Sequence, residues 1–265
     1  MRYYIAAVLL IVLLLLVPRS ATADAPPLTL DDVFPPRDLS SLGLDESRLR
    51  VLIATGDVIP ARSVDMRIRG RGNDFFYPLA KTADLLREGD LTVINLEAPL
   101  IRDCPPHDEG MQFCGQSGFA AALKKAGVDV ATLENNHIGN YGTAGIQETV
   151  QNLEAQEIAW ANRDTPAIVD VRGTKFGFLA FTDKFITYAH GNFIFDQMWS
   201  DETRTGVVGR YTFYDNTLVG VEYTPVQLYE YAQPRGMTGQ AAQAVLQRMA
   251  AASREQARIV TEEAR

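Results

Sequence analysis

Three apolar segments of this chain each end in polar side chains that are able to do chemistry. The clusters are Gly56-Asp57, Asn95-Leu96-Glu97 and Asn135-Asn136-His137. Two carboxylates, an amide oxygen and an imidazole suit a hard or borderline divalent metal. Such a metal can orient a phosphate or an amide and generate hydroxide near neutral pH. These residue types therefore predict a metal-assisted reaction, provided that the fold brings them together.

Each of these side chains also has an ordinary structural interpretation. Asp57 suits a helix N-cap or a turn, and Glu97 suits a solvated loop. Asn135 and Asn136 suit left-handed turn conformations, and His137 suits a hydrogen-bonded structural position. The case for a site therefore rests on all three segments ending in the same way.

The segments that carry these clusters predict an α/β fold. Residues 48–57, 91–99 and 128–137 have the apolar runs of buried strands, while residues 77–90, 118–127 and 142–158 have helical spacing. Strands that alternate with helices form a sheet that is at least partly parallel. Ligands bind beyond the carboxyl ends of the strands in such sheets, so adjacent pairing would join the three polar clusters.

The second half of the chain has a different pattern. Residues 166–181 predict two strands joined at Arg172-Gly173, and residues 205–231 predict a hairpin that turns at Asp215-Asn216. Residues 238–265 predict one helix. We therefore expect antiparallel strands and a helix to follow the parallel part of the sheet.

The ends and the charge suggest where the protein acts. Arg2, the apolar run of residues 5–17 and the Ala-x-Ala of residues 21–23 predict a signal peptide or an N-terminal anchor over residues 1–23. A linker (24–47), the main domain (48–230) and a C-terminal helix (231–265) follow. We expect an exported protein that is periplasmic, extracellular or anchored outside the cytoplasmic membrane. The net charge of −8 argues against a nucleic-acid partner.

The two cysteines, Cys104 and Cys114, flank a nine-residue segment. In an oxidising compartment this pair would close a short loop as a disulfide. A metal site that also uses His107 is the alternative, although this spacing matches no standard zinc pattern.

Four sequence blocks resemble those of the capsule-synthesis CapA proteins. They are GDVIPAR (56–62), VINLEAPL (93–100), ENNHIGNYG (134–142) and HGNFIFDQ (190–197). These poly-γ-glutamate capsule proteins are related to calcineurin-like metallophosphoesterases. The resemblance implies an α/β sandwich with a metal site at the strand ends, on the outer side of a bacterial membrane.

The resemblance also implies roles for single residues. Asp57, Glu97 and Asn136 match positions of metal ligands, which would bind a divalent ion such as Mn, Fe, Zn or Mg. His137 matches the catalytic histidine beside the scissile group. Further substrate-binding candidates are Arg62, Asn95 and Asn135.

The chain departs from the family pattern in its histidines. The usual His-Trp-Gly and Gly-His-x-His blocks are absent, and the chain contains only His107, His137 and His190. His190 is either a substitute ligand or a residue at the end of a strand. Asn140 stands where the family often has Asp, and an amide cannot stabilise a protonated His137 as a carboxylate would. The α/β domain is therefore expected to be incomplete.

Three functions stay open at this point. The first is a metal-dependent hydrolase or transferase that acts on the capsule polymer. The second is a non-catalytic protein that binds or exports poly-γ-glutamate with the membrane capsule machinery, through a basic rim. That rim would consist of Arg62, Arg67, Arg69 and Arg71. The third is an exported phosphoesterase with another substrate.

Overall fold

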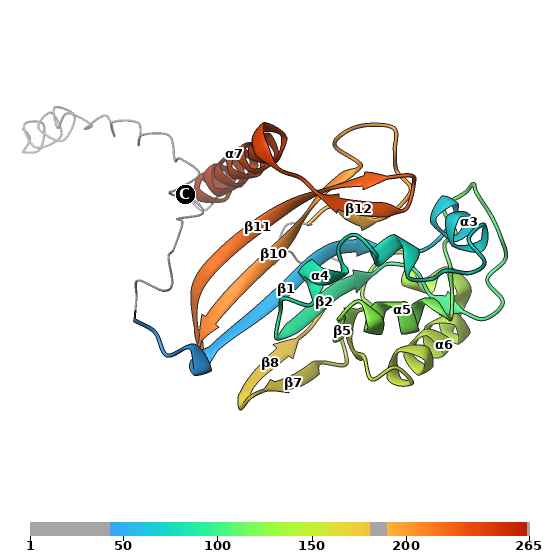
Figure 1. Ribbon diagram of the computed structural model, residues 1–265, viewed down its shortest axis with the longest axis horizontal. Helices are drawn as coiled ribbons and strands as arrows, with labels where there is room; N and C mark the ends of the chain where they lie inside the picture. Colours follow the sequence, from blue (N-terminus) through green and yellow to red (C-terminus); the bar gives the residue numbers. More distant parts are fainter. Residues whose placement is uncertain (1–42, 181–189, 264–265) are drawn as a thin grey trace, which may run out of the picture. The chain divides into compact units, whose positions relative to one another are not determined.

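An eight-stranded mixed sheet forms the centre of the protein (Figure 1). The computed structural model describes residues 43–180 and 190–263, with residues 253–263 as backbone only. Seven strands follow the order β12-β11-β10-β1-β2-β5-β6, and β9 pairs with the end of β1. The strands are β1 (Leu49–Val58), β2 (Leu91–Leu96), β5 (Val130–Thr132), β6 (Ala159–Ala161), β9 (Asn192–Ile194), β10 (Thr205–Tyr214), β11 (Thr217–Tyr229) and β12 (Gln233–Gly236).

The half of the sheet that contains β1, β2, β5 and β6 is parallel. Parallel neighbours need crossover connections, and these contain α4 (Ala83–Leu86), α5 (Phe119–Lys125) and α6 (Gly142–Glu154). The helices cover one face of these strands (Figure 1). The main core lies between the two layers and includes Ile53, Ile94, Phe119, Leu123 and Leu153, all at most 1% exposed. The α/β prediction is confirmed.

The other half of the sheet is antiparallel, as the alternating pattern predicts. β10 and β11 form the hairpin around Asp215-Asn216, and β12 extends it. A separate hairpin of β7 (Ala167–Val171) and β8 (Thr174–Phe178) turns at Arg172 and Gly173, both at positive φ. It packs on a cluster formed by the parallel strands, which includes Leu91 and Val130. The C-terminal helix is α7 (Gly239–Glu263), and the start predicted at residue 231 is wrong because residues 233–236 form β12.

Some elements differ from the sequence prediction. The helix predicted over residues 77–90 is wrong, because Tyr77–Leu79 forms a 3-10 turn that contains Pro78 and only Ala83–Leu86 is α-helical. The basic segment after β1 contains the helix α3 (Ser63–Arg69). Two short strands, β3 (Leu100–Ile101) and β4 (Gly115–Gln116), pair in parallel. Their formation depends on tertiary contacts rather than on local pattern.

The turn expected at Gly56-Asp57 is also wrong, since β1 continues to Val58. Gly56 is needed there because β9 approaches closely: a Cβ atom at this position would lie 1.7 Å from the Gly191 carbonyl oxygen. The Asp57 N–H donates to that same oxygen at 3.0 Å. The sequence predicts that β1 ends near Gly56, but β1 continues past this glycine and also pairs with β9.

The predicted signal peptide or anchor (residues 1–23) lies outside the described residues. Within the part of the chain that is described, no helix has the length and apolar character to cross a membrane.

Candidate functional site

The carboxylates of Asp57 and Glu97 meet at the carboxyl ends of β1 and β2. Parallel pairing places Asp57 opposite Asn95, one strand residue before Leu96 ends β2. The Asn95 side-chain amide donates to Asp57 Oδ1 at 2.8 Å and to Glu97 Oε2 at 3.2 Å. The Glu97 N–H in turn donates to the Val58 carbonyl at 3.0 Å. The sequence prediction that adjacent strand ends unite these residues is confirmed for this pair.

The surroundings of Glu97 strongly perturb its carboxyl group. Burial raises the pKa of Glu97 to about 8, and the negative charge of Asp57 adds to this shift, while the hydrogen bond from Asn95 opposes it. Two acids held together by one amide donor favour either a shared proton or a cation between them. The two carboxylates therefore offer oxygen ligands of the kind that a divalent metal prefers.

Asn135 joins the third strand end to this pair. Its amide group donates to Asn95 Oδ1 at 3.1 Å and to the Leu96 carbonyl at 2.9 Å. Its carbonyl oxygen accepts from the N–H groups of His137 and Ile138 at 3.2 and 2.8 Å. Asn95 and Asn135 thus hold the loop after β5 against β2. Asn136, between Asn135 and His137, is exposed on this loop, and its role as a metal ligand stays a prediction.

His137 is held in a defined tautomer. Asn140 Oδ1 accepts from the Phe113 N–H at 2.7 Å, which fixes the orientation of the Asn140 amide. The same oxygen lies 3.2 Å from His137 Nδ1, so Nδ1 carries the hydrogen and donates it. Nε2 is then the nitrogen left with a lone pair. The Phe113 ring lies 4.4 Å from the imidazole, and His137 is only 9% exposed.

His190 is a structural residue rather than a free ligand. Its Nδ1 lies 3.0 Å from the Ala54 carbonyl, and its Nε2 lies 3.1 Å from the Tyr211 hydroxyl. A carbonyl can only accept, so Nδ1 donates and Nε2 accepts from Tyr211. Burial lowers the pKa of His190, which favours this neutral form. Its two ring nitrogens are thus both engaged, and the interpretation as a strand-end residue is the one that fits.

Arg62 makes an ion pair that the sequence analysis missed. Its guanidinium contacts the Asp196 carboxylate, with side chains that are 12% and 3% exposed. The guanidinium carbon also lies 5.3 Å and 5.2 Å from the ring centroids of Phe113 and Phe195. Asp196 lies in the fourth sequence block, which places an acid in a segment of interest but does not show that Arg62 is its partner. The charge of Arg62 is therefore already compensated within the protein.

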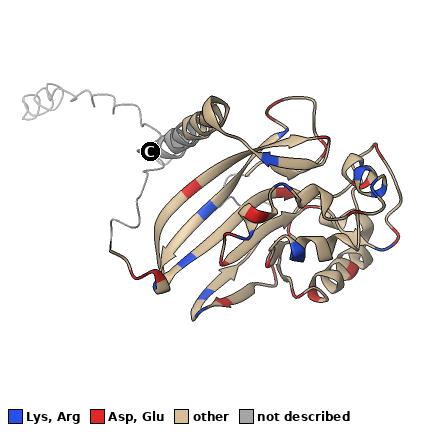
Figure 2. Cartoon of the chain, viewed as in Figure 1, with Lys and Arg blue, Asp and Glu red and all other residues tan. Residues whose placement is uncertain are grey.

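The other arginines of the predicted basic rim also have partners. Arg69 pairs with Asp65, and Arg71 contacts Glu230 and stacks on Tyr77. Arg67 lies 5.5 Å from the ring of Tyr231. Basic and acidic residues alternate over this region (Figure 2). Arg69 and Arg71 are therefore paired with acids, whereas Arg67 keeps its positive charge over an aromatic ring.

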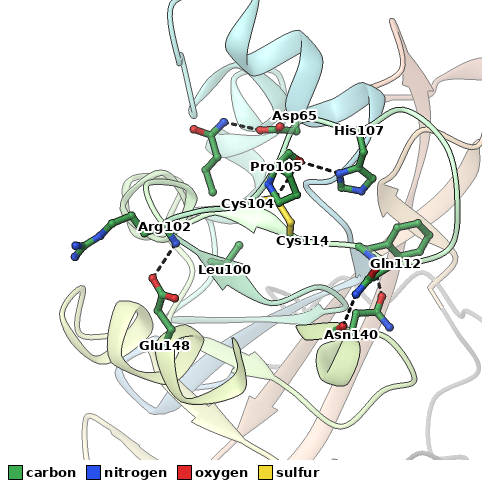
Figure 3. The surroundings of a disulfide bond; sticks show 12 residues. Asp65, Leu100, Arg102, Cys104, Pro105, His107, Gln112, Cys114, Asn140 and Glu148 are labelled. Carbon is green, nitrogen blue, oxygen red and sulfur yellow. Dashed lines mark hydrogen bonds between the residues drawn. A yellow bond between two sulfur atoms is a disulfide. The ribbon is translucent and has the colours of Figure 1, made fainter. Parts of the chain in front are cut away.

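The predicted disulfide between Cys104 and Cys114 is confirmed, with 5.8 Å between the Cα atoms (Figure 3). It closes the loop that contains Phe113, and the ring of Phe113 contacts His137. The Gly110 carbonyl of the same loop accepts from Arg62 at 3.1 Å. The stapled loop is thus one wall of the candidate site.

Comparison with known proteins adds the family. The profile described as bacterial capsule synthesis protein PGA_cap matches residues 51–185. The chain belongs to this capsule synthesis family. The match includes the two acids of the strand ends, His137 and the stapled loop, whereas His190 and Asp196 lie beyond it.

A curated relative supports the same family. The capsule biosynthesis protein CapA of Bacillus anthracis is 24% identical over 155 residues, which cover 54% of this chain and 37% of the relative. This member of the capsule synthesis family therefore spans little more than a third of the length of that relative.

Proposed function

We propose that this chain acts in capsule biosynthesis as a metal-dependent hydrolase or transferase on the capsule polymer, with poly-γ-glutamate as the polymer. Family membership supports the process. The observation that carries the chemistry is the Asp57–Glu97 pair, held by Asn95 at the strand ends beside the loop of His137.

In this proposal the residues of the chain divide the work. Asp57 and Glu97 would hold a divalent cation, with the exposed Asn136 as a further ligand. When bound, such a cation polarises an amide or carboxylate oxygen and acidifies a water molecule. His137 Nε2 has the lone pair that takes a proton from the attacking group and then returns it to the leaving group. Asn140 maintains the tautomer in which this lone pair is available.

The first experiment is metal analysis of the purified chain beside Asp57→Asn and Glu97→Gln. We expect about one divalent ion per wild-type chain, lost in both variants. Asp201→Asn is the matched control, because it also removes one acid. Asp201 is exposed, pairs with Arg204 and is not one of the proposed ligands. Absence of metal in the wild-type chain after incubation with Mn²⁺ or Zn²⁺ would refute the proposed site.

The second experiment separates catalysis from binding. Poly-γ-glutamate of defined length is incubated with the metal-loaded chain, and its length is measured by gel filtration. Shortening or transfer that disappears in His137→Ala, with metal content unchanged, would support the enzyme. Cleavage that is equal in the variant would exclude His137 from the chemistry.

A non-catalytic role is the second candidate, and one observation favours it. The sequence suggests His190 as the replacement for the missing histidine ligands. Both of its ring nitrogens are engaged in hydrogen bonds, so it does not take this role. A site with few ligands could bind a cation and bridge it to the carboxylates of the polymer without cleaving it. Metal-dependent polymer binding without any change in polymer length would establish this role.

We also propose that the protein is exported. The sequence of residues 1–23 supports export, and the Cys104–Cys114 disulfide fits an oxidising compartment. Protease treatment of intact cells and of spheroplasts would locate the protein. Protection from protease in both preparations would contradict export.

A further inference from the structure

The loop closed by the disulfide contains a buried ring nitrogen with no partner. His107 Nδ1 lies 3.0 Å from the Pro105 carbonyl, so this nitrogen carries the hydrogen (Figure 3). His107 Nε2 is therefore left with a lone pair. It is buried and has no hydrogen-bond partner among the described residues. A buried polar atom without a partner is costly and requires an explanation.

Two sulfur atoms lie beside this histidine. A ring nitrogen of His107 and the sulfur atoms of Cys104 and Cys114 all lie within 4.8 Å of one another. Zinc binds thiolate sulfur at about 2.3 Å and imidazole nitrogen at about 2.0 Å, so neighbouring ligand atoms on one ion are roughly 3.5–4 Å apart. In the disulfide the two sulfur atoms are bonded to each other, so they would have to move apart after reduction, whereas the His107 nitrogen already lies within 4.8 Å of both.

The surrounding fold holds both cysteines independently of the bond between them. Cys104 and Cys114 are 4% and 0% exposed. Cys114 directly precedes β4, which pairs with β3, and the Gly115 N–H donates to the Pro99 carbonyl at 2.9 Å. On the other side, Arg69 donates to the Cys104 carbonyl at 2.8 Å. Reduction of the disulfide would therefore leave the two thiols near each other.

We propose that the reduced loop is a zinc-class metal site formed by Cys104, Cys114 and His107. A thiol or phosphine reductant supplies two electrons, and with two protons the disulfide becomes two thiols. Zn²⁺ then displaces both thiol protons, and His107 donates its Nε2 lone pair. Water completes the coordination at the fourth position. The disulfide and the metal are thus alternative cross-links of one loop, selected by the redox conditions.

This inference is independent of the strand-end site. The three ligands share no residue with the Asp57–Glu97 pair, and the chemistry requires thiolates rather than carboxylates. The cross-link matters for that site nonetheless, because Phe113 adjoins Cys114 and contacts the His137 ring. A metal in the reduced loop would hold Phe113 in the way that the disulfide does.

The test uses Co²⁺ as a probe of the full chain. The protein is reduced with a phosphine, desalted without air and titrated with Co²⁺. We expect about one equivalent to produce the intense sulfur-to-cobalt charge-transfer absorption, which carboxylate sites do not give. Zn²⁺ should displace it. The oxidised protein should show no such band, which provides the background from any carboxylate site.

Variants assign the ligands and separate the two sites. Cys104→Ser should lose the charge-transfer band. His107→Ala should weaken cobalt binding at least about tenfold, because loss of even an outer-shell partner of a ligand typically costs about 10–100-fold in metal affinity. Asp57→Asn should leave the band unchanged. The proposal would be overturned if the reduced protein gave no thiolate-to-cobalt band. A reduced chain that unfolds and is not refolded by Co²⁺ counts as this result. Equal cobalt affinity in His107→Ala and in the wild type would also overturn it.

Discussion

At the scale of single residues, two charged pairs at the strand ends have opposite consequences. Asp57 and Glu97 are two acids that meet, and burial together with the charge of Asp57 raises the pKa of Glu97, so Glu97 tends to stay protonated. Arg62 and Asp196 are opposite charges that are both largely buried, so each depends on the other. The two acids need a proton or a cation to compensate their charge, whereas the charges of Arg62 and Asp196 compensate each other. This difference leads to two predictions.

Without metal, the free energy of unfolding should fall as the pH rises between about 4.5 and about 8. The pKa of Glu97 is raised from its usual 4.5 to about 8 in the folded protein, chiefly by burial. In this window the folded state keeps a proton that the unfolded state has lost, so rising pH favours unfolding. Glu97→Gln should remove this part of the pH dependence. Urea unfolding in a chelator at several pH values measures it.

Addition of Mn²⁺ to the wild-type chain should reverse the same trend. The cation competes with the proton for Glu97, so its stabilising effect should grow as the pH rises towards 8. Parallel pH slopes for the wild type and for Glu97→Gln in chelator would contradict the assignment of the raised pKa to this residue.

Asp196→Ala should destabilise the protein by about 3–5 kcal/mol, since it leaves the Arg62 guanidinium partly buried without its carboxylate. Asp201→Ala is the matched control. Asp201 pairs with Arg204, but its side chain is 67% exposed, and its loss should cost less than about 1 kcal/mol. Denaturant unfolding measures both. Equal losses would show that the buried pair contributes no more than a surface pair.

The sequence predicts some of these residues and not others, for physical reasons. Asp57 and Glu97 are predictable because each stands at the end of an apolar strand, and adjacent parallel strands end at the same edge. The partner of Arg62 is hard to predict because Asp196 lies 134 positions away. Likewise, only the hydrogen bonds of the fold distinguish the engaged His190 from the available His137.

At the scale of elements, the candidate site depends on the contact of β9 with β1. Gly56→Ala should destabilise the protein by about 3 kcal/mol, because its Cβ would collide with backbone rather than with a side chain that can move. Gly177→Ala is the control, since Gly177 also lies in a strand but has open space around its Cβ position. Thermal unfolding compares the two. A near-neutral Gly56→Ala would mean that β9 does not approach β1 so closely.

The long elements are predicted correctly because their pattern is local and regular. β1, β10, β11 and α6 each extend over ten or more residues with clear periodicity. The missed strands β3, β4, β6, β9 and β12 have only two to four residues. Such short segments carry too little pattern and form because a neighbouring strand is present. For the same reason, the helix predicted over residues 77–90 shortens where Pro78 and the packing of the segment decide its conformation.

At the scale of the whole molecule, charge limits how an anionic polymer can be bound. The chain has a net charge of −8, and the arginines around α3 are engaged with acids or aromatic rings. Poly-γ-glutamate would therefore meet repulsion at long range and few arginines without an acid partner around α3. A divalent ion between Asp57 and Glu97 would change this balance locally, because it replaces a repulsive pair with a site that attracts carboxylates.

Polymer binding should therefore require a divalent cation. We expect fluorescently labelled poly-γ-glutamate to bind the wild-type chain in Mn²⁺, to dissociate in chelator, and to bind Asp57→Asn weakly in either condition. Arg67→Ala should have little effect, because the polymer is expected to bind the cation at Asp57 and Glu97 rather than the segment of Arg67. Fluorescence anisotropy measures each of these cases. Binding that survives the chelator and weakens with NaCl and with Arg67→Ala would instead assign recognition to the basic rim, because direct contacts between Lys or Arg and a polyanion are screened by salt.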